Sequence, residues 1–273
     1  MQEGAFMSYK IKPFEELEFK DDFIFYKVMQ NEEACKGVIE RLLSIKVDHI
    51  EYPELQKTIM PYYTAKGVRL DVYVKDSDKV FNVEMQANPL SNPGMRARYY
   101  QSMIDVDCLM KGASYDELPD SYILFICLED PFEGGLPVYT FETVCEECPD
   151  LVLDDGTKKI FYNAGSADKE ENEELRALLN FVGSGESTDS FTDRLQNLIS
   201  QIKQREANKT EYMEMNIHDY DKFCAGKREG MQEVTENMIA ENFPVEQIAK
   251  LTGLSVEEIE KLKECKARVA RGD

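Results

Sequence analysis

The sequence contains no apolar run of the ~18 residues that a membrane-spanning helix requires. Its first residues, MQEGAFMSYK, lack the basic and then apolar order of a secretory signal. These two absences predict a soluble cytoplasmic protein. Hydrophobic residues make up 42% and charged residues 31% of the 273 positions, as in globular rather than disordered or fibrous chains. This length suits one domain with an appendage, or two small domains.

The chain also lacks a cysteine or histidine pattern that would define a disulfide framework or a zinc site. Its cysteines number seven, an odd count, so reduced thiols are expected. Cys145 and Cys148 form a single C-x-x-C, but a structural zinc ion usually takes four ligands, and the only histidines are His49 and His218. The sequence therefore disfavours a structural zinc ion.

Basic residues are in short supply, since 32 Lys and Arg stand against 53 Asp and Glu and give a net charge of -21. Such a charge repels polyanions at long range. The distribution is uneven: residues 66–111 carry seven basic and six acidic side chains, whereas residues 112–175 carry three and seventeen. Any surface that handles anions is therefore expected within residues 66–111.

Hydrophobic periodicity predicts the order helix, strands, helix, strand, which indicates an α/β core that ends near residue 165. Asn92 and Pro93 look like the N-cap and first position of a helix that stops at Gly112. Helices are expected at 23–29, 32–45 and 93–111. Strands are expected at 68–74, 80–86 and 122–128, with edge strands at 138–144 and 160–163.

After Gly165 the composition changes to helix formers and charge. We expect a core over 1–165, a helical extension that packs on it over 166–215, and a helical tail over 216–273. The tail ends in a helix-turn-helix-like hairpin whose second helix, SVEEIEKLKE, begins with a Ser255/Glu258 capping box. With four Glu against two Lys, this helix is disfavoured as a DNA reader. Its apolar positions favour self-association or internal packing.

The strands VRLDVYV and VFNVEMQ form a hairpin whose register follows from placing all their apolar residues on one face. Only antiparallel pairs of positions that sum to 155, such as Val72 with Val83, achieve this. Asp71 then stands across from Glu84 with Cβ atoms roughly 5 Å apart. Such a carboxylate pair is destabilising unless a proton or cation joins it, and Mg²⁺ is a suitable cation. The alternative is a solvated pair that splays apart.

The motif D-x(12)-E-x-Q, formed by Asp71, Glu84 and Gln86, resembles the PD-(D/E)XK nuclease superfamily. The closest resemblance is to its transposase-like branch of recombination-promoting nucleases. Further blocks that look like this branch occur in the same order and extend the resemblance over about residues 15–215: DDFIFYKVM, RARYYQSMIDVDCLMKG, SYILFICLEDPFEGG and DDGTKKIFYNAGS.

The resemblance implies a restriction-endonuclease-like α/β core, with a mixed sheet flanked by helices and a helical C-terminal extension. It implies an endonuclease that hydrolyses phosphodiester bonds of double-stranded DNA with Mg²⁺ or Mn²⁺ and promotes recombination. Asp71 and Glu84 match its metal-binding carboxylates. Gln86 stands where the superfamily more often has Lys, and a neutral amide can orient a water but cannot offset transition-state charge. Asp22, in a shared block, is a further candidate acid, with a helix-start residue as the alternative.

Arg96 and Arg98 are the candidate phosphate-binding residues. They open a shared block and lie in the first turns of a helix, where cations oppose the helix dipole and an anion nearby is expected. A solvated helix end is the alternative. Along the same helix, the apolar stripe that faces the core is expected to comprise Tyr99, Met103, Val106 and Met110.

Two functions from different classes thus compete. The first is the metal-dependent DNA endonuclease just described. The second is a catalytically weak or silent interaction or assembly protein on the same fold, suggested by the net charge and by Gln86. The C-terminal helices would then support a homo-oligomer.

Overall fold

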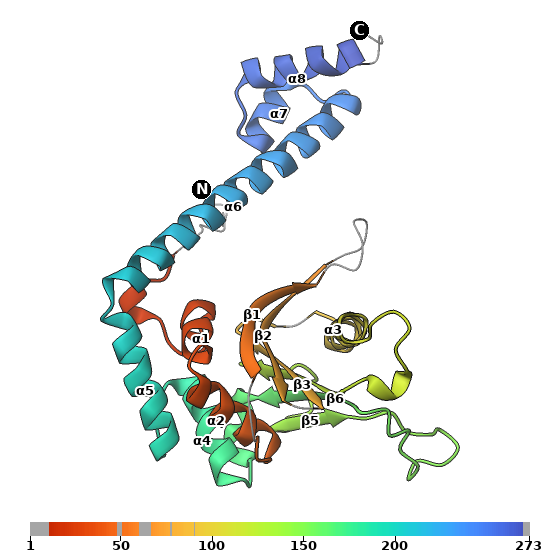
Figure 1. The fold of residues 1–273 in the computed structure, drawn as a ribbon. Helices are drawn as coiled ribbons and strands as arrows, with labels where there is room; N and C mark the ends of the chain where they lie inside the picture. Colours follow the sequence, from red (N-terminus) through yellow and green to blue (C-terminus); the bar gives the residue numbers. More distant parts are fainter. Residues whose placement is uncertain (1–10, 48–50, 60–66, 77, 90, 270–273) are drawn as a thin grey trace. The chain divides into compact units, whose positions relative to one another are not determined.

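The structure is a computed structural model that describes residues 11–47, 51–59, 67–76, 78–89 and 91–269 (Figure 1). The chain divides into two compact units, of which one is Lys12–Asn208 and the other contains Lys209–Asp273. Among the described residues, none of the helices combines the length and the apolar character needed to cross a membrane.

The first unit is built on a six-stranded mixed sheet in the order β1-β2-β3-β4-β6-β5. β1, β2 and β3 are antiparallel neighbours, β3, β4 and β6 are parallel, and β5 runs antiparallel to β6. The strands are β1 (Glu51–Ile59), β2 (Val68–Asp76), β3 (Lys79–Gln86), β4 (Asp120–Cys127), β5 (Val138–Phe141) and β6 (Thr157–Asn163).

The predicted α/β core of a mixed sheet flanked by helices is confirmed, with one error in strand order. Residues 160–163 were expected at an edge, but β6 lies between β4 and β5. The run in β4 is buried at every position from Ile123 to Cys127. This burial is typical of a strand covered on both faces, and it requires neighbours on both sides.

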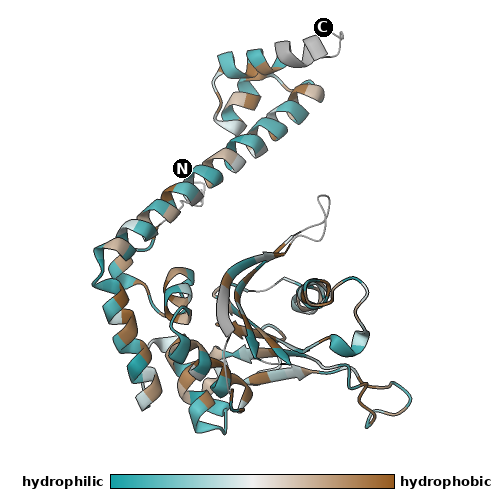
Figure 2. Cartoon of the chain, in the orientation of Figure 1, coloured by the Kyte–Doolittle hydropathy of each residue, from teal (hydrophilic) through white to brown (hydrophobic). Residues whose placement is uncertain are grey.

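Helices cover both faces of this sheet (Figure 1). α3 (Pro93–Cys108) packs alone on one face, and four helices lie on the other: α1 (Asp22–Met29), α2 (Glu32–Leu43), α4 (Glu173–Ser184) and α5 (Ser190–Lys203). Three short 3₁₀ helices complete the unit: η1 (Phe14–Glu16), η2 (Tyr115–Glu117) and η3 (Ala164–Lys169). Figure 2 shows polar and apolar residues alternating along α4 and α5, as expected for helices with one buried side.

Side-chain caps explain where several helices begin. Asn31 accepts from the backbone N–H of Ala34 at the start of α2, and Asn172 and Asp189 cap α4 and α5 in the same way. The start of α3 differs. Pro93 is its first residue, as predicted, but Asn92 has a φ of 55° and makes no side-chain capping bond, and the helix ends at Cys108 before Gly112.

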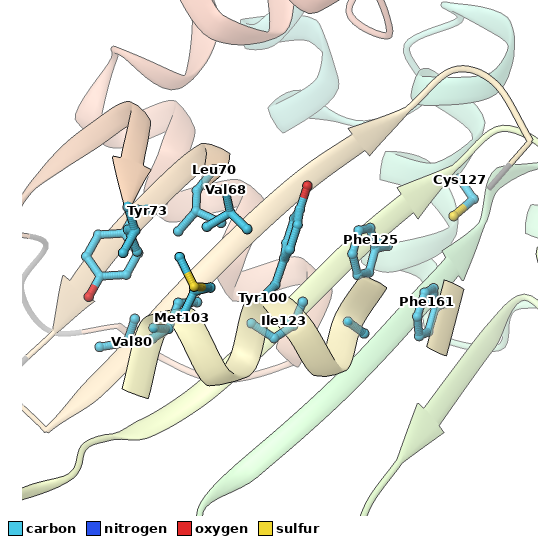
Figure 3. Packing of buried hydrophobic residues seen from close by; sticks show 13 residues of the cluster. Val68, Leu70, Tyr73, Val80, Tyr100, Met103, Ile123, Phe125, Cys127 and Phe161 are labelled. Carbon is cyan, nitrogen blue, oxygen red and sulfur yellow. The ribbon is translucent and has the colours of Figure 1, made fainter. Parts of the chain in front are cut away.

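The core on the α3 face of the sheet joins the helix to five strands (Figure 3). Its members are Ile59, Val68, Leu70, Tyr73, Val80, Ala97, Tyr100, Met103, Ile104, Ile123, Phe125, Cys127 and Phe161. The predicted apolar stripe of α3 is confirmed for Met103 and for Tyr99, which is half-buried and packs against this core, but it is wrong for Val106 and Met110, which are 60% and 76% exposed.

A buried polar residue explains the error. The stripe that faces the sheet contains Gln101, whose amide nitrogen donates to Ser121 Oγ and to Asp105 Oδ1. A prediction that counts only apolar residues leaves Gln101 out of the buried side. It therefore places that side about one residue away from its observed position.

The second unit contains α7 (Val245–Thr252), α8 (Val256–Val269) and, from Lys209 onward, α6 (Glu206–Ala240). The helical hairpin and its capping box are confirmed, since the backbone N–H of Ser255 donates to Glu258 Oε2 at 2.8 Å and that of Glu258 donates to Ser255 Oγ at 3.3 Å. Thr235, Ile248 and Ile259 are fully buried and form the centre of this unit.

Candidate active site

The hairpin of β2 and β3 has the predicted antiparallel register. Val72 pairs with Val83 and Tyr73 with Asn82, so paired positions sum to 155. The regular ladder ends at Val72 and Val83, one position before Asp71 and Glu84. The two carboxylates therefore stand where regular pairing between these strands stops.

The two side chains take over the hydrogen bonds of the missing ladder positions. The backbone N–H of Asp71 donates to Glu84 Oε1 at 3.1 Å, and the backbone N–H of Met85 donates to Asp71 Oδ2 at 3.2 Å. One oxygen of each carboxylate thus accepts from a backbone N–H of the neighbouring strand. The other oxygen of each carboxylate takes no part in these two bonds. These reciprocal bonds hold the pair in place before any ligand binds.

One part of the predicted hairpin is wrong. All apolar residues of β2 were expected on one face, but Val68 and Leu70 belong to the same cluster as Tyr73, three positions beyond Leu70. The alternation of side chains is interrupted near Asp71. On the neighbouring strand β1, Gln56 has a φ of 55°, so both backbones are irregular at this level.

Burial dominates the electrostatics of the pair. Glu84 is 1% exposed, and burial raises the pKa of its carboxyl group, with the nearby charge of Asp71 as the second cause. Burial also raises the pKa of Asp71, and the charge of Asp22 adds to this, while the cations of Arg96 and Arg69 act against it. The alternative of a solvated pair is therefore wrong for Glu84, and the site favours either a proton or a cation.

Gln86, the third residue of the motif, contacts α3. Its Oε1 accepts from Arg96 Nη1 at 3.3 Å. The same guanidinium donates through Nε and Nη2 to the hydroxyl oxygen of Tyr100, at 3.0 and 2.9 Å. The structure thus brings Asp71, Glu84, Gln86 and Arg96 to one place.

The other two candidates lie differently. Asp22 is the first residue of α1, is exposed, and is near enough to Asp71 to raise its pKa. Arg98 is exposed on α3, and it is absent from the described residues that line the groove beside the carboxylates. Asp22 therefore remains a candidate at the site, whereas Arg98 lies outside its lining.

A groove of about 670 Å³ lies between the start of β2 and the first turns of α3. Its described lining includes two arginines and two tyrosines: Gly67, Val68, Arg69, Ser91, Asn92, Met95, Arg96, Tyr99 and Tyr100. Arg96 also donates to Gln86 of the motif, so the groove adjoins the carboxylates. Both arginines fall within the window of residues 66–111 in which an anion-handling surface was predicted.

Three residues of this region were not among the sequence-based candidates: Arg69, Asn82 and Tyr100. Asn82 is fully buried on β3, two positions before Glu84. Its amide is near enough to lower the pKa of Glu84, yet neither amide atom completes a hydrogen bond within the described structure. The sequence did contain a signal for Asn82, since it is a polar residue in the middle of an apolar strand. An unpaired buried amide costs about 1–3 kcal/mol, so its presence there suggests a functional role.

The donor set fits a hard divalent cation. Mg²⁺ is commonly held by one or two carboxylates, with waters and substrate phosphates as the remaining ligands. Asp71 and Glu84 provide two such carboxylates beside a groove with cationic walls. Among the residues that the structure describes, no group of three or more His, Cys, Asp or Glu side chains could hold a metal ion.

A mixed sheet with half-buried Asp71 and buried Glu84 beside a cationic groove fits a nuclease-like class of protein. Residues 19–162 match the family described as PD-(D/E)XK nuclease family transposase. Since this match covers more than half of the sequence, the chain belongs to that family, and the predicted resemblance is confirmed over residues 19–162. Searches among curated proteins and among solved structures give no match.

Proposed function

We propose that the protein is a cytoplasmic, Mg²⁺- or Mn²⁺-dependent endonuclease of double-stranded DNA that acts in transposition or recombination. Membership of a nuclease family implies hydrolysis of phosphodiester bonds. The observation that carries the finer proposal is the pair of half-buried Asp71 and fully buried Glu84 beside a groove that contains Arg69 and Arg96. The six cysteines whose side chains are described are free thiols, which suits a reducing compartment.

In this proposal Asp71 and Glu84 hold the cation, and their reciprocal backbone hydrogen bonds keep both carboxylates in position. The bound ion would supply a water of lowered pKa and would offset charge on the phosphate. Gln86 orients the attacking water. Because its Oε1 accepts from Arg96, its amide nitrogen is the group left to donate.

The groove would hold the DNA backbone. Arg69 and Arg96 would contact phosphates, and Tyr99, which is half-buried in the lining, would limit the width of the strand that enters. These local cations oppose the repulsion from a net charge of -21. We therefore expect binding that weakens steeply with salt.

The test is nicking of supercoiled plasmid with Mg²⁺ or Mn²⁺ by the wild-type chain and by Asp71→Ala, Glu84→Ala and Glu84→Gln. Glu84→Gln keeps the shape of the side chain and its bond to the backbone of Asp71, so it controls for misfolding. The wild type should nick and the variants should not. Equal nicking by all four proteins would identify a contaminant and remove the proposal.

The alternative function, an assembly protein, is supported by a different observation. The C-terminal unit has an apolar groove between α6 and α8 lined by Cys224, Lys227, Arg228, Met231, Gln232, Leu254, Glu258, Lys261 and Leu262. A second copy of the chain would cover it and form a homo-oligomer. Leu254→Gln should then lower the mass measured by light scattering, whereas Leu251→Gln, an exposed leucine outside the groove lining, should not.

A further inference from the structure

The motif on β2 and β3 provides no positively charged side chain to offset the negative charge that develops on the phosphate. Hydrolysis of a phosphodiester adds negative charge to the phosphate in the transition state, next to Asp71 and Glu84. Gln86, the third residue of the motif, is neutral and cannot offset that charge. A fixed cation at this position would therefore have to come from another element of the fold.

Arg96 is the cation that contacts Gln86. It lies in the first turns of α3, and its Nη1 donates to Gln86 Oε1 at 3.3 Å. Among the described residues it forms no direct ion pair with a carboxylate, although its charge lowers the pKa values of Asp71 and Glu84 from a longer distance. Its guanidinium also lines the groove in which a phosphate would enter.

Tyr100 fixes the position of this guanidinium. The tyrosine hydroxyl oxygen accepts from both Nε and Nη2, and the guanidinium carbon lies 5.3 Å from the centre of the tyrosine ring. The ring itself is 8% exposed and packs at 6.0 Å from the ring of Phe125 in the core on the α3 face (Figure 3). The arginine is thus tied to the packed core of the sheet.

We infer that Arg96 offsets the charge that develops on the scissile phosphate, a role that a cation on β3 would otherwise fill, and that Tyr100 is its positioning residue. The inference rests on the proposed nuclease function. In the reaction, a water oxygen bonds to phosphorus as the bond from phosphorus to one sugar oxygen breaks. The proton of the water passes to solvent and the leaving oxygen takes a proton from solvent, so Arg96 transfers no proton.

The decisive experiment removes the positive charge from α3 at Arg96 and places one on β3 at Gln86. Arg96→Gln should lower kcat by roughly 10²–10³-fold, the usual cost of removing one donor to a transition-state anion, with a smaller change in KM. Arg205→Gln, the same substitution at an exposed arginine beyond α5, is the matched control and should leave kcat unchanged. The double variant Arg96→Gln with Gln86→Lys should recover at least about tenfold of the lost rate, because it returns one cation to the site.

Tyr100→Phe tests the positioning role. It keeps the ring and its packing on Phe125 but removes the oxygen that accepts from Arg96, so kcat should fall by about tenfold while the melting temperature changes little. In the Arg96→Gln background the same change should have no further effect, as expected for two residues that act through one contact. An equal further loss in that background would show that Tyr100 acts independently of Arg96.

A readout separate from turnover distinguishes this role from metal binding. The rise in melting temperature on adding Mg²⁺ should persist in Arg96→Gln and should disappear in Asp71→Asn. If the wild type cleaves and Arg96→Gln matches Arg205→Gln, the inference is wrong and the proposed function stands. If the wild type does not cleave with Mg²⁺ or Mn²⁺, the proposed function and the inference both fail.

Discussion

On the α3 face of the sheet, Asn82, Glu84 and Gln101 are buried although they are polar. In the C-terminal unit, Ile217 and Leu251 are 60% and 64% exposed although they are apolar. Neither placement is favourable by itself. A buried polar group loses its hydration, and an exposed apolar side chain keeps its contact with water.

The two regions therefore indicate different kinds of ligand. On the sheet, Glu84 lies near a groove with cationic walls, and a small ion or a proton offsets the cost of burying its carboxylate. The apolar groove between α6 and α8 is removed from water only by another surface of similar extent. If the proposed functions hold, the chemistry belongs to the sheet and any assembly to the helices, and each leads to a different measurement.

Asp71→Asn should have the largest effect, since it removes a charge that the proposed cation requires and keeps the size of the side chain. We expect the rate of plasmid cleavage to fall by about a thousandfold or more, equivalent to about 4 kcal/mol of transition-state stabilisation. Asp78→Asn, in the exposed turn between β2 and β3, makes the same charge change and is the control. A similar loss in both variants would mean that overall charge, not the site, governs cleavage.

The sequence predicted those parts of the site that depend on the alternation of side chains between the two faces of a strand. Alternation along β2 and β3 fixed the register that places Asp71 across from Glu84, because a shift by one residue would move every apolar side chain to the other face. The family blocks added Gln86 and Arg96. The irregular backbone at Gln56 had no such signal, nor did the position of Val68 and Leu70 on the α3 face.

The contact between Arg96, Tyr100 and Gln86 was not predictable, because it depends on how α3 rolls against the sheet. That rotation is set partly by the buried amide of Gln101, which a hydrophobic pattern counts as surface. The interior position of β6 depends likewise on long-range pairing with β5 rather than on local pattern. Contacts between distant elements are thus the part of the site that required the structure.

Within the C-terminal unit, two substitutions on α7 compare buried and exposed apolar residues directly. Ile248 is fully buried, so Ile248→Ala should lower the stability of this unit by about 2–5 kcal/mol. Leu251 is 64% exposed, so Leu251→Ala should change it by less than about 0.5 kcal/mol. Hydrogen exchange of the α7 amides in the full chain measures both, and equal effects would mean that Leu251 is covered in solution.

The buried carboxylates predict that the metal-free protein loses stability as the pH rises. Burial raises the pKa of Glu84 above the ordinary value of 4.5, so between the two values the folded state binds more protons than the unfolded state. The stabilisation is complete below the unfolded pKa and is lost as the pH rises through the folded one.

Glu84→Gln should remove most of this pH dependence, because the amide cannot ionise. In EDTA at about pH 8.5 the variant should be more stable than the wild type by about 1–3 kcal/mol, the cost of an unmet buried polar group. Urea denaturation at about pH 5 and about pH 8.5 measures the difference. A wild type whose stability rises over this interval would contradict the buried pair as the dominant titration.

The smallest effect on kcat is expected for Arg98→Gln. This substitution tests whether exposed Arg98 has the same role as Arg96 in the groove. Arg98 is exposed and absent from the described lining of the groove, so kcat should stay within about twofold of the wild type. If Arg98 contacts a DNA phosphate, the slope of log affinity against log salt should fall by about 0.9, the value for one lost phosphate contact. Binding measured by fluorescence anisotropy over a salt series gives this slope. A loss of kcat as large as that of Arg96→Gln would place Arg98 at the scissile phosphate and would end the distinction between the two arginines.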